Sequence, residues 1–132
     1  MPANIESEGV QTLPSAHTFP ETVSRITSAL RLHGIKIFAA IDQQAEATAA
    51  GLSMPPTTLI LFGNPKAGTP LMVTQPLSTL DLPLKVAVWE SPEGAVFVSF
   101  NTAAYIIARH HLPPALSANI APAEKLIAAA LL

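Results

Sequence analysis

Residues 84–100 contain the pattern that most limits how this chain can fold, because two alternating runs flank a short turn. Apolar and other residues alternate in 84–89 and again in 95–100. The segment between them, Glu90-Ser91-Pro92-Glu93-Gly94, is rich in residues that favour turns. The pattern predicts a β-hairpin, which joins antiparallel strands and argues against a doubly wound parallel sheet. The side chains predicted to pack inward are Val86, Val88, Val96 and Val98.

The other periodic segments predict helices interspersed with strands. Thr18 and Glu21 fit a capping box, and Gly34 ends the apolar periodicity that follows, so a helix is predicted over residues 20–33. The remaining predicted elements are an edge strand or an irregular segment within 10–17, strands at 35–42 and 57–62, a short helix at 43–50, and helices at 101–111 and 122–131. The order predicts an α+β fold, a small two-layer sandwich with a mostly antiparallel sheet backed by helices. Residues 1–9 are expected to be a flexible lead-in and residues 10–132 a single domain.

Composition excludes several classes of function. The chain has 132 residues and no cysteine, which excludes disulfide scaffolds, thiolate metal sites and cysteine nucleophiles. The net charge is −2 and the basic residues are scattered, so no nucleic-acid partner is expected. Apolar runs are too short to span a membrane, and the amino-terminal residues predict no secretory signal, so the cytoplasm is the expected compartment. Charged residues are only 12% of the chain, and a surface with so few charges favours a homodimer.

The segment Gly63–Pro70 is the first candidate site. Asn64 is a good helix N-cap and Pro65 suits the first helical position, while Pro70 is expected to limit any helix to about one turn. Lys66 falls in the first turn, where the helix dipole disfavours a cation, so a negative partner is expected beside it. That partner is either Asp42, at the end of a neighbouring strand, or a bound anion. The alternatives are that the segment is only a tight turn and that Asp42 only caps the helix after it.

The remaining candidates lie in the second half of the chain. His110 and His111 are adjacent, and neighbours on a helix point about 100° apart, so they do not form a metal-binding pair. No metal and no cofactor are predicted. Arg109 and His110 also suit the end of a helix, where cations are favoured. Trp89 and Tyr105 line either a pocket or the core.

Several strings in the chain resemble a known family. They are Ile41-Asp42, the run from Leu59 to Met72 that contains Phe-Gly-Asn-Pro-Lys-Ala-Gly-Thr-Pro-Leu-Met, the run from Asp81 to Val86, Trp89-Glu90, Gly94, Phe100-Asn101, Tyr105 and Arg109-His110. Over residues 10–112 the chain resembles the bacterial and archaeal family called domain of unknown function 302. The resemblance implies a helix-backed antiparallel sheet with a β-α-β₄-α layout, like that of the TATA-binding protein, often as a dimer, and no established activity. The chain departs from the family pattern at Gln43, where many members have histidine, and at Thr102-Ala103, where many have Asp-Pro. A shared layout carries no inference of DNA binding.

Two functions remain open. The first is a non-catalytic module that binds a small molecule, with an anion as one candidate, or that works by self-association. The second is an enzyme that uses Asp42, Lys66 and His110 as acid–base groups, which requires them to converge on one cleft. The candidate ligand-binding residues are Asp42, Asn64, Lys66, Thr69, Trp89, Asn101, Tyr105, Arg109 and His110.

Overall fold

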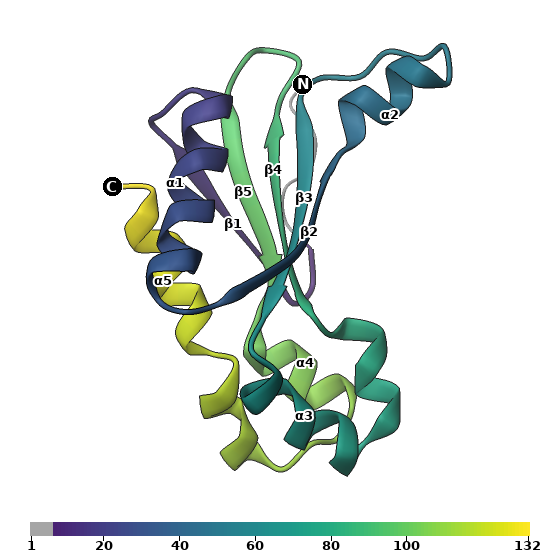
Figure 1. The fold of residues 1–132 in the computed structure, drawn as a ribbon, viewed down its shortest axis with the longest axis vertical. Coiled ribbons are helices and arrows are strands. Elements are labelled where there is room, and N and C mark those ends of the chain that lie inside the picture. The colour runs from purple at the N-terminus through teal and green to yellow at the C-terminus, as the bar shows by residue number, and fades with distance from the viewer. Residues whose placement is uncertain (1–6) are drawn as a thin grey trace.

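A computed structural model describes residues 7–132 as a five-stranded antiparallel sheet with helices on one face and at both ends (Figure 1). The strands are β1 (Val10–Ser15), β2 (Lys36–Asp42), β3 (Thr57–Gly63), β4 (Leu84–Glu90) and β5 (Val96–Asn101). Their order across the sheet is β1-β5-β4-β3-β2. Pro14, which lacks a donor, therefore lies in an edge strand, as predicted.

One face of the sheet is covered by two helices, α1 (Phe19–Leu32) and α5 (Pro122–Ala130), which lie side by side. Ile26 and Leu30 of α1 and Ile127 of α5 pack on the inward side chains of β3, β4 and β5 and form the main core. All four hairpin valines are buried there, which confirms the predicted hairpin and its register. When α1 and α5 are the only helices counted, the elements follow the β-α-β₄-α order that the family resemblance implies.

The other helices lie at the two ends of the sheet. At the lower end in Figure 1 are α3 (Pro65–Thr74), α4 (Ala103–Arg109) and two 3₁₀ helices, η1 (Pro76–Asp81) and η2 (Pro114–Asn119). Leu71, Leu82, Ile106 and Ile107 form the centre of a second apolar cluster there. At the upper end, α2 (Gln43–Ala49) follows β2. No helix within residues 7–132 is long and apolar enough to cross a membrane.

Two predicted helix boundaries are wrong. The α3 helix continues through Pro70 to Thr74 instead of stopping after one turn. Proline lacks an amide hydrogen bond and its ring crowds the carbonyl four residues earlier, but the next residue, Leu71, is fully buried in the second cluster. Tertiary packing therefore outweighs the local penalty. The helix expected at 101–111 begins at Ala103, with Thr102 as its N-cap, and Asn101 is the last residue of β5. Of the expected lead-in 1–9, residues 1–6 lie outside the described residues.

Candidate functional site

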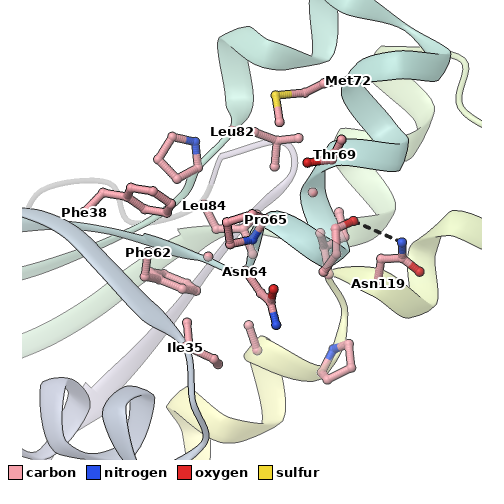
Figure 2. A pocket seen from close by; sticks show the side chains of 17 residues that line it. Ile35, Phe38, Phe62, Asn64, Pro65, Thr69, Met72, Leu82, Leu84 and Asn119 are labelled. Atoms are coloured by element: carbon pink, nitrogen blue, oxygen red, sulfur yellow. Dashed lines mark hydrogen bonds between the residues drawn. The ribbon is translucent and has the colours of Figure 1, made fainter.

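A cavity with a volume of about 420 Å³ lies where β3 passes into α3 (Figure 2). Three distant segments form its walls: the β3–α3 connection, the start of β4, and the stretch from η2 into α5. The lining positions are 35, 38, 62–65, 67–69, 72, 82–84, 119, 120, 122 and 123. Eight of these positions fall within residues 62–72, the most specific string of the family resemblance. Residues of that string therefore form one wall of the cavity.

The cavity lining is apolar and uncharged. None of the described lining residues is charged, and the polar side chains among them are Asn64, Thr69 and Asn119. The aromatic rings of Phe38 and Phe62 and the side chains of Ile35, Met72, Leu82 and Leu84 account for much of the wall. A cavity of this size and composition suits a small molecule that is mostly apolar.

The amides at the start of α3 bond within the chain. Asn64 caps the helix: its Oδ1 accepts from the Lys66 amide at 2.9 Å. Its carbonyl oxygen accepts from the amides of Ala67 and Gly68, both at 2.9 Å. Pro65 has no amide hydrogen to donate. These bonds satisfy the amides of the first turn within the chain.

A second hydrogen bond holds the cavity together from the opposite wall. Asn119 Nδ2 donates to the carbonyl oxygen of Ala67 at 3.0 Å, as the dashed line in Figure 2 marks. Because Asn64 Oδ1 and Asn119 Nδ2 are both engaged with backbone, the orientation of each amide is fixed. No described residue accepts from Asn64 Nδ2 or donates to Asn119 Oδ1.

The predicted proximity of Asp42 and the Gly63–Pro70 segment is wrong. Strands β2 and β3 are antiparallel, with Asp42 opposite Thr58 and Lys36 opposite Gly63, so Asp42 and α3 lie at opposite ends of the sheet. Asp42 Oδ1 instead accepts from the Ala45 amide at 2.9 Å and caps α2, which was the alternative reading of this residue. Lys66 is exposed, lies outside the cavity lining and makes no ion pair with a described residue. A Lys66→Met change is therefore expected to alter stability little.

Arg109 and His110 meet a carboxylate that the sequence did not single out as a site residue. His110 Nε2 lies 2.5 Å from Asp81 Oδ2, and Arg109 donates to both carboxylate oxygens at 2.9 and 3.1 Å. His110 is buried and Arg109 is exposed. The cluster ties the end of η1 to the end of α4, and Leu82 and Pro83, directly after Asp81, line the cavity. The cluster thus supports the cavity wall.

Trp89, Asn101 and Tyr105 lie away from the cavity. Trp89 stacks on Phe97, with ring centroids 4.7 Å apart, on the face of the sheet that carries no helix. Asn101 is exposed at the end of β5. Tyr105 packs so closely on Gly9 that a Cβ there would lie 2.2 Å from its ring. Of the predicted candidates, Asn64 and Thr69 line the cavity, and the acid–base groups Asp42, Lys66 and His110 do not converge there.

Comparison with known proteins places this architecture in a family. The family model described as "Domain of unknown function DUF302" matches residues 11–131. The chain belongs to the DUF302 family. A crystal structure of an uncharacterised conserved DUF302 protein from Bacillus stearothermophilus has the same fold, with a TM-score of 0.78 over 95% of this chain and 97% of that one at 21% identity. The α+β sandwich is therefore the fold of the DUF302 domain.

Two curated relatives are longer than this DUF302 chain. Proteins named "Fluoride-specific ion channel FluC 1", from Brucella suis biovar 1 (strain 1330) and Brucella abortus biovar 1 (strain 9-941), are each 39% identical to it over 119 residues. The match covers 90% of this chain but 46% and 43% of those proteins. The chain thus spans less than half the length of the curated relatives it matches.

Proposed function

We propose that this DUF302 chain is a non-catalytic domain that binds one small, uncharged and mostly apolar molecule in the cavity between β3, α3 and α5. The observation that carries the proposal is a cavity of about 420 Å³ whose described lining contains no charged side chain. Ligand sites of comparable volume are largely apolar with a few polar groups that fix orientation. An isolated ion in such surroundings loses its hydration without compensation, so the ligand is uncharged.

The polar groups of the cavity define the ligand further. With one lone pair of its Oδ1 engaged by the Lys66 amide, Asn64 still offers the N–H donors of Nδ2. With one N–H of its Nδ2 donated to the Ala67 carbonyl oxygen, Asn119 still offers its Oδ1 as a carbonyl acceptor. A ligand that carries both an acceptor and a donor, such as a primary or secondary amide on an apolar body, complements this pair.

A matched pair of probes tests the chemistry. Benzamide and benzoate share an aromatic body and differ in the amide and the charge. We expect benzamide at millimolar concentration to raise the melting temperature of the chain and benzoate to leave it unchanged, because a ligand stabilises a protein only by binding its folded state. A larger shift with benzoate than with benzamide would contradict the proposal and favour the anion expected from the sequence.

Filling the cavity from Gly68 separates binding from stability. A Cβ at Gly68 meets only the end of Met72, at 4.0 Å, so there is room for a side chain that points into the cavity. Gly68→Leu is expected to gain about 1 kcal/mol from helix propensity and to abolish the benzamide shift. Gly68→Ala, the matched control, gains similar stability and leaves most of the cavity open, so it keeps the shift. Thermal melts with and without benzamide measure both effects. A Gly68→Leu variant that still responds to benzamide would place the ligand elsewhere.

We propose, as a second function, that the domain serves a fluoride channel as a partner in the cytoplasm. Two relatives that bear the name of a fluoride channel match nearly all of this chain with less than half of their own length. The described helices here are too short to span a membrane, so conduction in those proteins is assigned to the part outside the match. Fluoride is not proposed as the ligand of the cavity, since the described lining has no cation.

Growth in fluoride tests this second proposal. A strain that lacks the chain is expected to stop growing at a lower fluoride concentration than its parent, and to recover when the gene is restored. Chloride at equal ionic strength is the control and is expected to affect both strains equally. Equal fluoride tolerance of the two strains would refute a role beside the channel and leave the cavity proposal intact.

A further inference from the structure

Phe38 interrupts the pairing of the edge strand β2 with β3, directly beside the cavity. Ile37 lies opposite Phe62 and Ala39 lies opposite Leu61, so three consecutive residues of β2 face two of β3 and Phe38 is the extra one. This irregularity is a β-bulge, which redirects side chains and occurs often next to functional sites. The bulge therefore gives the Phe38 ring a direction that regular strand pairing does not impose.

The redirected ring lies at the mouth of the cavity. Phe38 lines the cavity and is 45% exposed, whereas Phe62, the second aromatic ring of the lining, is 2% exposed. A Cβ built on Gly63 would lie 3.7 Å from the Phe38 ring, so the ring lies close to the β3 backbone. Figure 2 shows both rings on one side of the cavity and Asn119 on the other. A molecule that enters from solvent therefore meets Phe38 before Phe62.

A cation contacts the Phe38 ring from outside the cavity. Lys36 Nζ lies 5.0 Å from the ring centroid, within the range of about 6 Å for a cation–π contact. Lys36 is exposed, is not among the lining residues and makes no ion pair with a described carboxylate. The negative face of the ring attracts the ammonium, which restricts a ring that the bulge leaves outside the cross-strand register. Lys36 thus positions the ring without touching the cavity.

We propose that Phe38 selects an aromatic ligand for the cavity and that Lys36 positions the Phe38 ring for this purpose. The inference rests on the proposed function and names the class of ligand within it, a flat, uncharged aromatic ring that carries an amide head. The ring of the ligand packs on Phe38 and Phe62, and its head faces the amides of Asn64 and Asn119. Aromatic pairs gain energy beyond the area they bury, which corresponds to about two- to tenfold in affinity.

Cyclohexanecarboxamide is the matched probe for benzamide. It carries the same head on a saturated ring that buries at least as much apolar surface, so the hydrophobic effect alone gives benzamide no advantage. Thermal melts over a concentration series of each probe give the two dissociation constants. We expect the constant for benzamide to be about two- to tenfold lower. A ratio below two would overturn the aromatic selectivity and leave the cavity proposal intact. Binding of neither probe would overturn the proposed function and this inference with it.

A substitution at Phe38 locates the selectivity. Phe38→Leu keeps an apolar side chain at a half-exposed position of an edge strand, so the variant is expected to fold and to lower the affinity ratio of the two probes below two. Phe97→Leu is the matched control, because Phe97 stacks on Trp89 on the helix-free face, the face of the sheet opposite α1 and α5, and does not line the cavity. It is expected to keep the wild-type ratio. A Phe38→Leu variant that keeps the ratio would overturn the role of Phe38.

A double-mutant comparison tests the role of Lys36. Lys36→Met removes the charge and keeps an apolar stem, and it is expected to weaken benzamide binding about two- to fivefold, the worth of an exposed cation–π contact. The same change in the Phe38→Leu background is expected to have no effect, because the ring through which Lys36 acts is absent. Lys36→Arg, which stacks on aromatic rings, is expected to restore binding. An equal loss in both backgrounds would overturn the positioning role of Lys36.

Discussion

Val88→Asp is expected to leave the chain unfolded at 37 °C. Val88 is fully buried on β4, opposite Val98 of β5 and Thr58 of β3, inside the main core. No described cation lies among the residues of that core, so the new carboxylate has no partner. Even one partner of a buried ion pair left alone costs about 3–5 kcal/mol, and an isolated carboxylate in an apolar core costs more, so the loss is comparable with the roughly 5–15 kcal/mol that stabilises a whole domain. Circular dichroism and thermal melting measure the loss.

Two control variants separate charge from volume and position. Val88→Ala removes two methyl groups, at about 0.8 kcal/mol each before any cavity cost, and is expected to stay folded with a lower melting temperature. Val73→Asp places the same charge on an exposed position and is expected to change stability by less than about 0.5 kcal/mol. A Val88→Asp variant that melts with the wild type would refute the strand register.

Asp81→Ala is expected to cost about 2–3 kcal/mol, more than the loss of its exposed partner Arg109. The Asp81 and His110 side chains are only 10% and 6% exposed, so removing the carboxylate leaves the imidazole without its acceptor in a buried place. A buried polar group that loses its partner costs about 1–3 kcal/mol, and bonds to a charged group lie at the upper end. Urea unfolding of the two proteins measures the difference.

Arg109→Ala is the control for this variant. The Arg109 side chain is 47% exposed, and exposed ion pairs are worth about 0–1 kcal/mol. Its removal is therefore expected to have a small effect, while Asp81→Asn, which still accepts a hydrogen bond, should fall between the two. If Asp81→Ala costs no more than Arg109→Ala, then the pair with His110 does not stabilise the cavity wall.

Local patterns in the sequence were sufficient to predict most of the secondary structure. The period of two around the hairpin and the N-cap at Thr18 express forces between near neighbours, and both are confirmed. The Glu21 carboxylate of the expected capping box lies beside His17 and Arg25 instead. The α3 boundary at Pro70 was wrong because the burial of Leu71 depends on α4 and η2, which lie far along the chain. A local rule for proline contains no information about such packing.

The candidate site was predictable only in part, for a similar reason. Asn64 and Thr69 were found because capping and turn chemistry are local. Pairing Asp42 with Lys66 required the direction of β2 relative to β3, which the pattern within either strand does not encode. The bond between Asp81 and His110 joins residues 29 positions apart, and no spacing rule links them.

The position of Trp89 has a consequence for spectroscopy. It is the only tryptophan of the chain, it lies on the helix-free face, and it is not among the residues that line the cavity. Its emission therefore reports the polarity around that face. Binding of a ligand in the cavity is expected to leave the emission unchanged. Tryptophan emission thus follows changes at the helix-free face, and the melting temperature follows binding in the cavity. The two measurements are independent and can be made on the same sample. An emission change on adding benzamide at constant association state would reveal that the two surfaces communicate through the sheet.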